Sequence, residues 1–600
     1  MRITVVKRIL LTTGLVAAAA PCLSATALAA GRDGRVAVFP APGTTSAAAR
    51  TEISFRFVAP GAGITVSVSG SSSGRVAGDL RPHLDGAGVS FVPARRLRGG
   101  ERVTVRTDLA IHGARDGDFR FTVARRPTPR QVNDGRLELP RIPPGTADTF
   151  RSSDLEAPKV RVTRGPAEGT SPGEIFLAPV SLRDNPNPDG PMIVDERGRL
   201  VWFRQAQGGK VFDFKTQTFE GRPVLTWWEG RFALGWGYGE YTVLDDSYRE
   251  ILRIRGANGY RADFHDMVLT PRNTALVLVY DRVRRDLRSV GGPRDGVVVD
   301  NVIQEIEPRT GRVLFEWHSV DAVPLARSRS KVQGNRTHDY FHANSVEVDG
   351  DGNLIVSARN TCSLYKIERE TGALLWTLGG RRSDFKMGRG SRFCFQHDAR
   401  RVADGAISLL DNAAGPPKLR AQSRAILLDV DEQARTVRLR RAYQHPGRFS
   451  APNQASARVQ PNGNVFVGWG AVPVFSEFSP DGRLLLDGII ASGKGSYRAV
   501  RSPWTGRPSS LPSIASQRRG ARLAVWASWN GATEVARWEV LAGDSPEALS
   551  PAQRLASTGF ETAISLPAAP RYVAVRALDA EGRELGRSRV VEAGRSADGG

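Results

Sequence analysis

Short runs of alternating apolar and polar residues, separated by Gly, Asn, Asp or Pro, follow one another along most of this chain. Alternation with a period of two is typical of strands that bury one face, and the separating residues are typical of tight turns. Helical periodicity is nearly absent. The pattern therefore predicts an all-β protein built from hairpins.

Four of the expected hairpins share one design, in which a polar residue precedes an apolar run, a turn and a second apolar run. They begin with HDMVLTP at His265, HANSVEVDG at His342, HDARRVADG at His397 and QASARVQPNG at Gln454. These starts lie 77, 55 and 57 residues apart, which fits propeller blades of about 40 to 50 residues with insertions. Because blades surround a channel, equivalent positions on their innermost strands meet near its axis. We therefore expect the three histidines to converge.

A second set of hairpins, each with Gly or Asp in its turn, is expected to form the outer strands of the blades. These are MIVDERGRLVWF, VIQEIEPRTGRVLFEW, YKIERETGALLWTLGG, ILLDVDEQARTVRL and FSEFSPDGRLLLDG. Counted together, the inner and outer hairpins predict a six-bladed β-propeller over residues 173–502.

A chain of 600 residues is too long for one core and should hold several domains. Short alternating runs predict an N-terminal β-sandwich over residues 31–125 and a C-terminal one over 503–600, similar to fibronectin type III and ending in a disordered tail. The intervening segment 126–172, rich in Pro, Arg, Glu and Gly, is expected to be a linker or a strap over the propeller.

Residues 1–30 have the three parts of a secretory signal peptide. Arg2, Lys7 and Arg8 precede an apolar run, and Ala-Leu-Ala at 27–29 forms a small-residue cleavage site. No other apolar stretch approaches the roughly 20 residues that a membrane span requires. The sequence thus predicts an exported protein, secreted or at the cell surface, without a transmembrane span.

The chain is strongly basic, with 84 Lys and Arg against 62 Asp and Glu and a formal net charge of +22. Such a balance favours anionic partners. The arginines are scattered through turns and strand edges, with no basic helix or aromatic-rich binding motif. We therefore expect no nucleic acid partner.

The hairpin that follows His342 predicts a further site residue. A turn centred between Gly350 and Asp351 places His342 opposite Arg359 in the antiparallel pair. A guanidinium beside three imidazoles suits an anion with several oxygens, such as sulfate, phosphate or carboxylate. Three histidines could instead bind zinc, but Arg359 would repel a cation, so we expect no metal.

Asp266 and Asp398 each follow one of the three histidines. Neighbouring residues of a strand point to opposite faces, so we expect these carboxylates to accept hydrogen bonds between blades rather than to act in catalysis. His338, four residues before His342, is expected on the incoming loop.

Cys362 and Cys394 are the cysteines that remain after removal of the signal peptide. Cys362 lies three residues after Arg359, and Cys394 three residues before His397. In an exported protein this arrangement favours a disulfide. Two buried free thiols are the alternative.

The segments DFHDMVLTP, YFHANSVEVDGDGNLIVSARNT, TGALLWTLGG and FQHDAR resemble the motifs of the arylsulfate sulfotransferases, the bacterial arylsulfotransferase family that uses no nucleotide sulfate donor. The resemblance covers roughly residues 170–500. It implies a six-bladed propeller with the active site at the channel mouth and a histidine that is transiently sulfurylated. By motif, the nucleophile is His397, and His265, His342, Asn344 and Arg359 surround it, with Asn344 assigned to substrate binding.

The predicted function is that of an exported sulfotransferase. It would move a sulfuryl group from an aryl sulfate ester to a phenolic acceptor by a ping-pong mechanism through a sulfohistidine, without a cofactor. One of His265 or His342 would protonate the departing phenolate. In agreement with this scheme, the sequence contains no GxxxxGK[ST] phosphate-binding motif.

Two other classes of function compete with this prediction. One is a non-catalytic surface propeller that binds an anionic ligand or glycan through the same basic site. The other is a quinone-dependent dehydrogenase propeller, favoured by the TGALLW-type turns; it would need a calcium-binding acidic cluster, which the sequence does not offer.

Overall fold

The computed structural model describes residues 34–594, except residues 60, 133–146, 182–186 and 234. Within these ranges antiparallel strands dominate; the helical elements are α1 (Ser319–Ala322) and three short 3₁₀ helices. The predicted all-β class is confirmed. No helix in this part of the chain is long and apolar enough to cross a membrane. The predicted signal peptide lies outside the described residues.

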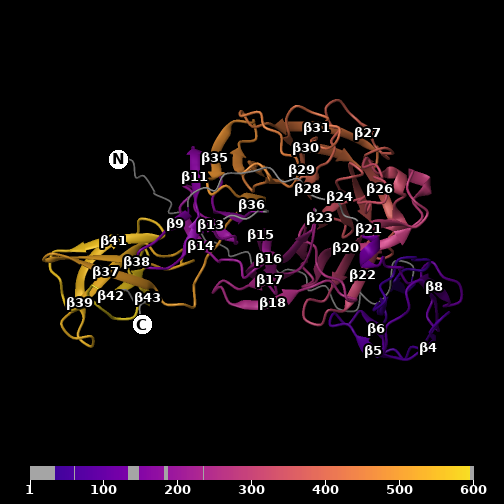
Figure 1. Ribbon diagram of the computed structural model, residues 1–600, viewed down its shortest axis with the longest axis horizontal. Coiled ribbons are helices and arrows are strands. Elements are labelled where there is room, and N and C mark those ends of the chain that lie inside the picture. The colour runs from indigo at the N-terminus through magenta and orange to yellow at the C-terminus, as the bar shows by residue number, and fades with distance from the viewer. Residues whose placement is uncertain (1–33, 60, 133–146, 182–186, 234, 595–600) are drawn as a thin grey trace, which may run out of the picture.

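Six sheets form the middle of the molecule (Figure 1), and their strands pair antiparallel except for β27 (Lys386–Met387) with β31 (Thr436–Tyr443). The first three, from the first strand outward, are β36 (Gly495–Ser502), β12 (Glu174–Val180), β13 (Met192–Val194) and β14 (Leu200–Phe203); β15 (Lys210–Phe219), β16 (Arg222–Ala233), β17 (Trp236–Leu244) and β18 (Glu250–Ile254); and β19 (Met267–Leu269), β20 (Ala275–Arg285), β21 (Gly296–Ile306) and β22 (Val313–His318).

The last three sheets are built in the same way. They are β23 (Ala343–Val348), β24 (Leu354–Ala358), β25 (Ser363–Ile367) and β26 (Leu374–Gly379); β28 (His397–Arg401), β29 (Ile407–Asp411), β30 (Arg424–Asp431), β31 (Thr436–Tyr443) and β27 (Lys386–Met387); and β32 (Ser456–Val459), β33 (Val465–Gly468), β34 (Val474–Phe478), β35 (Leu484–Ile490) and β11 (Val160–Arg164).

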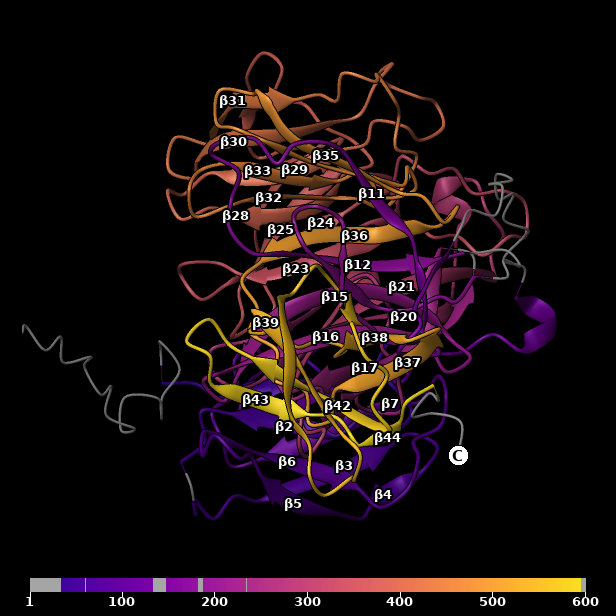
Figure 2. The same cartoon turned by 90° about the vertical axis from the view of Figure 1, so that its left-hand side faces the viewer.

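The first strands of these sheets contact one another in the cyclic order β36, β15, β19, β23, β28, β32 and back to β36. Figures 1 and 2 show β36, β15 and β23 near the middle of the stacked sheets. The start of each first strand therefore faces the start of its neighbours, which is the arrangement that the histidine repeat requires.

Strands from the two ends of this region complete two of the sheets. β36 pairs with β12, with Phe176 opposite Val500, and β11 pairs with β35, with Val160 opposite Ile490. Since β11 lies in the segment predicted as a linker, the last part of that segment is built into a sheet. Before it, β9 (Ala147–Thr149) and β10 (Glu156–Pro158) form a two-stranded ribbon.

The hairpins predicted from the alternation are confirmed. The four hairpins of the repeat are β19–β20, β23–β24, β28–β29 and β32–β33. The five predicted outer hairpins are β13–β14, β21–β22, β25–β26, β30–β31 and β34–β35, and each lies outside the first strand of its sheet.

Two further pairs of sheets flank the middle region, at the indigo and yellow ends of Figure 1. The N-terminal pair is β1 (Ala37–Phe39), β2 (Ile53–Arg56), β6 (Gly88–Pro93) and β5 (Gly78–Pro82) with β4 (Gly74–Val76), β3 (Val66–Gly70), β7 (Arg102–Thr107) and β8 (Phe119–Thr122). The C-terminal pair is β37 (Ser513–Arg519), β38 (Arg522–Ser528) and β41 (Glu561–Leu566) with β40 (Ser550–Ala556), β39 (Arg537–Gly543), β42 (Tyr572–Leu578), β43 (Glu584–Arg587) and β44 (Val591–Glu592). Each pair has its own apolar core.

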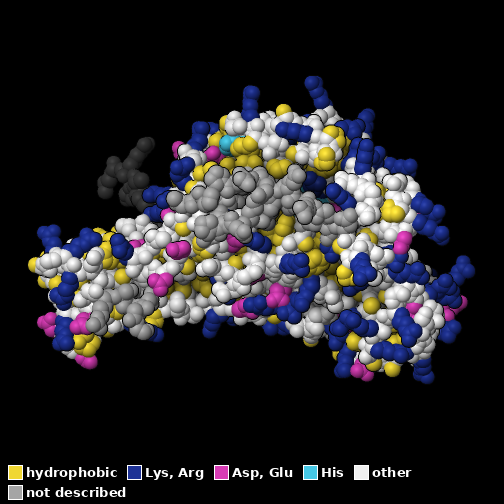
Figure 3. Space-filling view, viewed as in Figure 1, with side chains coloured by type: hydrophobic (Ala, Val, Ile, Leu, Met, Phe, Trp, Pro, Cys, Tyr) yellow, Lys and Arg dark blue, Asp and Glu magenta, His cyan; other side chains and the backbone are white. Residues whose placement is uncertain are grey.

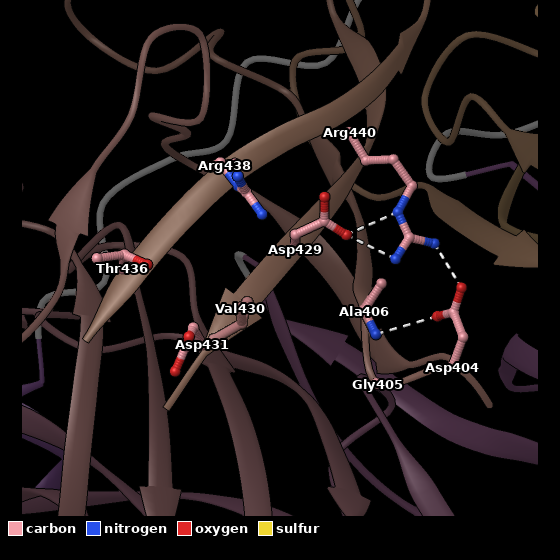
Figure 4. A pocket seen from close by; sticks show the side chains of 9 residues that line it. All are labelled: Asp404, Gly405, Ala406, Asp429, Val430, Asp431, Thr436, Arg438 and Arg440. Atoms are coloured by element: carbon pink, nitrogen blue, oxygen red, sulfur yellow. Dashed lines mark hydrogen bonds and ion pairs between the residues drawn. The ribbon is translucent and has the colours of Figure 1, made fainter. Parts of the chain in front are cut away.

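The surface is rich in basic side chains, and on the face seen in Figure 3 they outnumber the acidic ones. A shallow pocket lies between the β28–β29 turn and strands β30 and β31 (Figure 4), where Arg440 binds Asp404 at 2.5 Å and Asp429 at 2.6 Å. Because His397 begins β28, this turn lies at the opposite end of the hairpin from the histidine.

Candidate active site

The three histidines of the repeat occupy equivalent places in three consecutive sheets. His265 lies two residues before β19, His342 directly precedes β23, and His397 begins β28. All three are buried. The ring centres of His265 and His342 are 4.8 Å apart. The ring of Tyr497, from β36, lies 5.6 Å from His265 and 6.4 Å from His397, so the three imidazoles converge as the repeat predicts.

Arg359 lies where the hairpin register predicts it. Its backbone N–H donates to the carbonyl oxygen of His342 at 2.9 Å. The guanidinium donates to Oδ1 of Asn360 at 2.7 Å, and its central carbon lies 5.0 Å from the ring centre of Phe395. Burial lowers the pKa of Arg359 below its ordinary value. Within the described ranges no carboxylate forms an ion pair with it, so its charge is open to an anionic ligand.

Hydrogen bonds fix the proton position on the ring of His397. Asn412 donates through Nδ2 to the carbonyl oxygens of Ala451, at 3.0 Å, and Gln454, at 3.1 Å. Its Oδ1 is therefore turned toward Nδ1 of His397, 2.8 Å away, and must accept a hydrogen from it. Nε2 of His397 receives the backbone N–H of Gln454 at 3.2 Å, so Nε2 carries a lone pair.

The surroundings of His397 also keep its ring neutral. Burial is the main reason that its pKa lies well below the ordinary value, and the positive charge of Arg359 lowers it further. The hydrogen bond to Asn412 opposes these effects without overcoming them. A neutral imidazole with its lone pair on Nε2 is a competent nucleophile at neutral pH.

His265 is bound to a carboxylate rather than to an amide. Its Nδ1 lies 2.5 Å from Oδ1 of Asp263, whose Oδ2 accepts the backbone N–H of Gly237 at 2.6 Å. Burial raises the pKa of Asp263 to about 7, although the backbone N–H groups of Gly237 and His265, which donate to this carboxylate, oppose the rise. Burial also lowers the pKa of His265 well below its ordinary value. The pair can therefore share one proton near neutral pH.

His342 is hydrogen-bonded through Nδ1 to Oδ2 of Asp339. Burial alone would raise the pKa of Asp339, but the charge of His342, the hydrogen bond between them and the charge of Arg359 lower it below its ordinary value. Asp339 is thus ionised at neutral pH, so a carboxylate faces Nδ1 of His342.

A row of stacked rings forms one wall of the site. Phe264 stacks on His265 at 4.2 Å, His265 on Tyr280 at 5.2 Å, and Tyr280 on Trp236 at 6.1 Å between ring centres. The hydroxyl of Tyr280 donates to the carbonyl oxygen of Ala343 at 2.6 Å. This wall fixes the plane of His265 and joins the β19 sheet to the β23 sheet.

Asn344, predicted to contact substrate, is fully buried. Its Nδ2 donates to the carbonyl oxygen of Gln396 at 2.7 Å, directly before His397. The backbone carbonyl oxygen of Asn344 accepts a hydrogen from the guanidinium of Arg498 at 2.8 Å. These contacts hold the segment that carries His397; the predicted contact with substrate stays a prediction.

Asp266 and Asp398 accept hydrogen bonds from other sheets, as predicted. Asp266 binds Lys215 of the β15 sheet at 2.7 Å and Arg400 of the β28 sheet at 2.7 Å. Asp398 binds Arg458 of the β32 sheet at 3.1 Å and also Arg400 of its own strand at 2.8 Å. Although burial opposes ionisation, the surrounding cations lower the pKa of both carboxyls below the ordinary value.

Cys362 and Cys394 form the predicted disulfide, with Cα atoms 4.4 Å apart. The bridge joins the turn after β24, which carries Arg359, to the loop before β28, which leads to His397. It therefore ties together two of the segments that build the site.

Sequence reasoning missed several residues that orient the site. Tyr280 and Asn412 lie within two residues of the positions that face His265 and His397 in their hairpins, so the register argument used for Arg359 indicates their neighbourhood but not the residues themselves. Asp263 and Asp339 lie two and three residues before their histidines. Tyr497 comes from the β36 sheet, which has no histidine, and no signal in the sequence marks it.

No group of three or more His, Cys, Asp or Glu among the described residues is arranged to hold a metal ion.

A family model described as arylsulfotransferase (ASST) matches residues 215–491. This range contains the three histidines, Arg359, Asn412 and both cysteines. No curated protein matches the chain.

Solved structures resemble the chain only weakly. A periplasmic gluconolactonase from Pseudomonas aeruginosa is 11% identical, with a TM-score of 0.30, over 71% of this chain and 98% of its own. A catalytically inactive virginiamycin B lyase from Staphylococcus aureus is 7% identical, with a TM-score of 0.29, over 62% of this chain and 96% of its own. A protein of unknown function from Bacteroides caccae is 11% identical, with a TM-score of 0.33, over 55% of this chain and 100% of its own. Similarities at this level support no inference about the site.

Proposed function

Residues 215–491 belong to the arylsulfotransferase family, and from this premise we propose that the protein transfers a sulfuryl group from an aryl sulfate ester to a phenol through His397. The observation that carries the proposal is the fixed tautomer of this histidine, with Nδ1 bound to Asn412 and a lone pair on Nε2. The same tautomer is what an attack on sulfur requires.

In the first half-reaction, the hydrogen bond from the N–H of Gln454 to Nε2 of His397 breaks, and Nε2 attacks the sulfur atom of the donor. A bond forms between Nε2 and sulfur, and the bond between sulfur and the aryl oxygen breaks. Because the transition state spreads negative charge over the sulfuryl oxygens, fixed cationic donors lower the barrier. Arg359 is the group best suited to this role, since no carboxylate in the described ranges forms a direct ion pair with it.

The departing phenolate needs a proton, because the parent phenol has a pKa near 10. We assign this role to His342, whose partner Asp339 has a lowered pKa and stays ionised at neutral pH. His265 is less suited to carry the proton, since burial lowers its pKa well below the ordinary value. When Asp263 holds the shared proton, Nε2 of His265 carries a hydrogen and can donate to a sulfuryl oxygen.

In the second half-reaction, the acceptor phenol loses its proton to His342 while its oxygen attacks sulfur. The bond between Nε2 and sulfur breaks, and His397 regains its lone pair. The net reaction converts an aryl sulfate and a phenol into a new aryl sulfate and the released phenol, so both histidines return to their initial states. Two such steps through one covalent intermediate give ping-pong kinetics.

The cyclic contacts between first strands support a six-bladed propeller as the scaffold. On this interpretation residues 173–502 form the catalytic domain, and the flanking pairs of sheets are β-sandwiches. The disulfide supports the exported, extracytoplasmic location that the signal-peptide pattern predicts.

The test is to incubate the purified protein with 4-nitrophenyl sulfate, with and without added phenol. Release of 4-nitrophenol should rise strongly with phenol, and phenyl sulfate should appear in equal amount, without a nucleotide or a divalent metal. Inhibition by a chelator, or an absence of turnover over a panel of aryl sulfates, would contradict the proposal. Binding of these esters without turnover would instead favour the non-catalytic, anion-binding alternative.

A further inference from the structure

Three arginines lie beside the candidate site and have no partner of opposite charge. Arg329 belongs to the segment between β22 and β23, and Arg381 and Arg392 belong to the loop between β26 and β28. All three are exposed. Within the described ranges none of them forms an ion pair with a carboxylate.

The strand directions place these arginines at the same end of the sheets as the histidines. His342 directly precedes β23, so this end of the sheet is where β24 and β26 finish and β25 begins. The segment before β23 and the loop after β26, which hold Arg329 and Arg381, therefore emerge at this end. Arg392 lies between β27 and β28, and because β28 begins with His397, it approaches the histidine end of that sheet.

Hydrogen bonds connect these segments to one another and to the turn that carries Arg359. The backbone N–H of Arg329 donates to the carbonyl oxygen of Asn360 at 2.7 Å. Nε of Arg381 donates to the carbonyl oxygen of Ser328 at 3.1 Å. Arg392 lies two residues before Cys394, whose disulfide to Cys362 holds the same turn.

The charges of Arg381 and Arg392 both act on Arg329. Partial burial is the largest cause that lowers the pKa of Arg329 below its ordinary value, and the positive charges of Arg381 and Arg392 lower it further. Clustered like charges repel and destabilise a surface that has no bound counter-charge, whereas an anion placed among them relieves the repulsion. This arrangement suits an anionic group with several oxygens, because each guanidinium offers a planar fork of donors.

We propose that Arg329, Arg381 and Arg392 bind a second anionic group of the substrate, remote from the sulfate ester that faces His397. The inference rests on the proposed function and defines its substrate class: aromatic sulfates that carry a further sulfate, sulfonate or carboxylate group. A substrate with one anionic group engages Arg359 alone. One with two engages Arg359 and the arginine cluster together.

The first experiment measures binding without chemistry. Naphthalene-2-sulfonate and naphthalene-2,6-disulfonate are suitable probes, because their sulfur is bonded to carbon and cannot be transferred. Calorimetry should show that the disulfonate binds the protein more tightly than the monosulfonate. The triple variant Arg329→Gln, Arg381→Gln, Arg392→Gln should lose about tenfold in disulfonate affinity, as expected for a few partly exposed ion pairs, with little change for the monosulfonate.

The matched control removes three exposed arginines outside the six sheets: Arg96→Gln, Arg522→Gln, Arg589→Gln. It changes the net charge equally, so it should leave the preference for the disulfonate intact. Equal affinities of the intact protein for the two probes would overturn the proposal. It would also be overturned if the two triple variants lost equal affinity for both probes, because the arginines would then act only through the net charge of the protein.

Turnover of 4-nitrophenyl sulfate separates this inference from the proposed function. Turnover without any preference for the disulfonate would overturn the arginine cluster as a binding site and leave the sulfotransferase proposal in place. A preference for the disulfonate that the cluster variant abolishes, in a protein that turns over no aryl sulfate, would support the anion site and overturn the sulfotransferase.

Discussion

The Nδ1 atom of His397 lies 2.8 Å from Oδ1 of Asn412, so a neutral amide orients this ring. The other two imidazoles of the site face carboxylates, Asp263 and Asp339. A carboxylate stabilises a protonated imidazole, whereas an amide fixes the tautomer without attracting a proton. The difference between these partners separates the proposed nucleophile, His397, from the two histidines whose rings face carboxylates.

Replacing Asn412 with Asp should move the acidic limb of the pH–rate profile toward alkaline pH. A carboxylate beside Nδ1 raises the pKa of His397, by about one to three units for an opposite charge in contact. Protonated His397 has no lone pair, so the rate falls as pH drops through its pKa, and a higher pKa moves that fall to higher pH. The measurement is the pH dependence of the first half-reaction. An unchanged limb in Asn412→Asp would argue against His397 as the nucleophile.

Loss of His397 and loss of Arg359 should have different consequences. His397→Ala removes the nucleophile, so the initial burst of 4-nitrophenol should disappear. Arg359→Lys keeps a positive charge without the planar fork, and loss of a charge-stabilising donor typically costs about 10²- to 10³-fold in kcat. Rapid-quench kinetics separates the two cases.

The covalent intermediate can be sought directly. Mass spectrometry of protein treated with donor and no acceptor should find an acid-labile sulfuryl adduct on the peptide that contains His397. An adduct on the peptide of His265 or His342 instead would overturn the assignment of roles, and full activity in His397→Ala would overturn the mechanism.

His342→Gln should harm poor leaving groups more than good ones. A proton donor matters most when the departing phenolate is strongly basic, and general acid catalysis contributes about 10²- to 10⁴-fold. We expect a large loss with phenyl sulfate and a small one with 4-nitrophenyl sulfate. The check is the dependence of the first-step rate on the basicity of the leaving group. If His265→Gln, and not His342→Gln, showed this steep dependence on leaving-group basicity, the proton donor would be His265 instead.

The sequence predicted the strands and the convergence of the histidines because both depend on local repetition. Alternation and turn residues located the hairpins, and the register of one of them located Arg359 opposite His342. The contacts that orient the rings come from elsewhere in the chain. Tyr497 belongs to β36, which joins β12 only after the chain has passed through the other sheets, and no local pattern reports such a pairing.

The proton positions on the rings were equally beyond the sequence. Asn412 could face His397 with either end of its amide, and the carbonyl oxygens of Ala451 and Gln454 decide which. Likewise, the pattern identified Asn344 as a polar residue of the site but could not show that its side chain holds the carbonyl oxygen of Gln396. Such details depend on backbone groups, which every sequence has in common.

Thiol titration of the denatured, unreduced protein after removal of the signal peptide should find no free thiol. The bridge between Cys362 and Cys394 closes a loop with a sequence separation of 32, and restricting such a loop in the unfolded chain contributes about 3 to 4 kcal/mol to stability. The variant Cys362→Ser, Cys394→Ser should therefore unfold at lower urea concentration. Two titratable thiols in the parent protein would contradict the bridge.

Arg498 is the central cation of the charge network beneath the histidines, and its loss should be strongly destabilising. It is buried and binds Asp213, Asp266 and Asp398, the last two at 3.0 and 3.3 Å. Arg498→Met would leave these carboxylates partly uncompensated, and breaking a buried ion pair in this way costs about 3 to 5 kcal/mol. Urea unfolding measures the loss.

An exposed pair provides the control for this prediction. Arg507 binds Glu534 at 2.6 Å with both side chains largely open to solvent, and such pairs contribute at most about 1 kcal/mol. Arg507→Met should therefore change the free energy of unfolding little. If uncompensated carboxylates cause the loss in Arg498→Met, adding Asp213→Asn should recover part of it, because one buried charge then no longer needs a partner. No recovery in the double variant would mean that the packing of the Arg498 side chain, rather than its charge, stabilises the centre of the sheets.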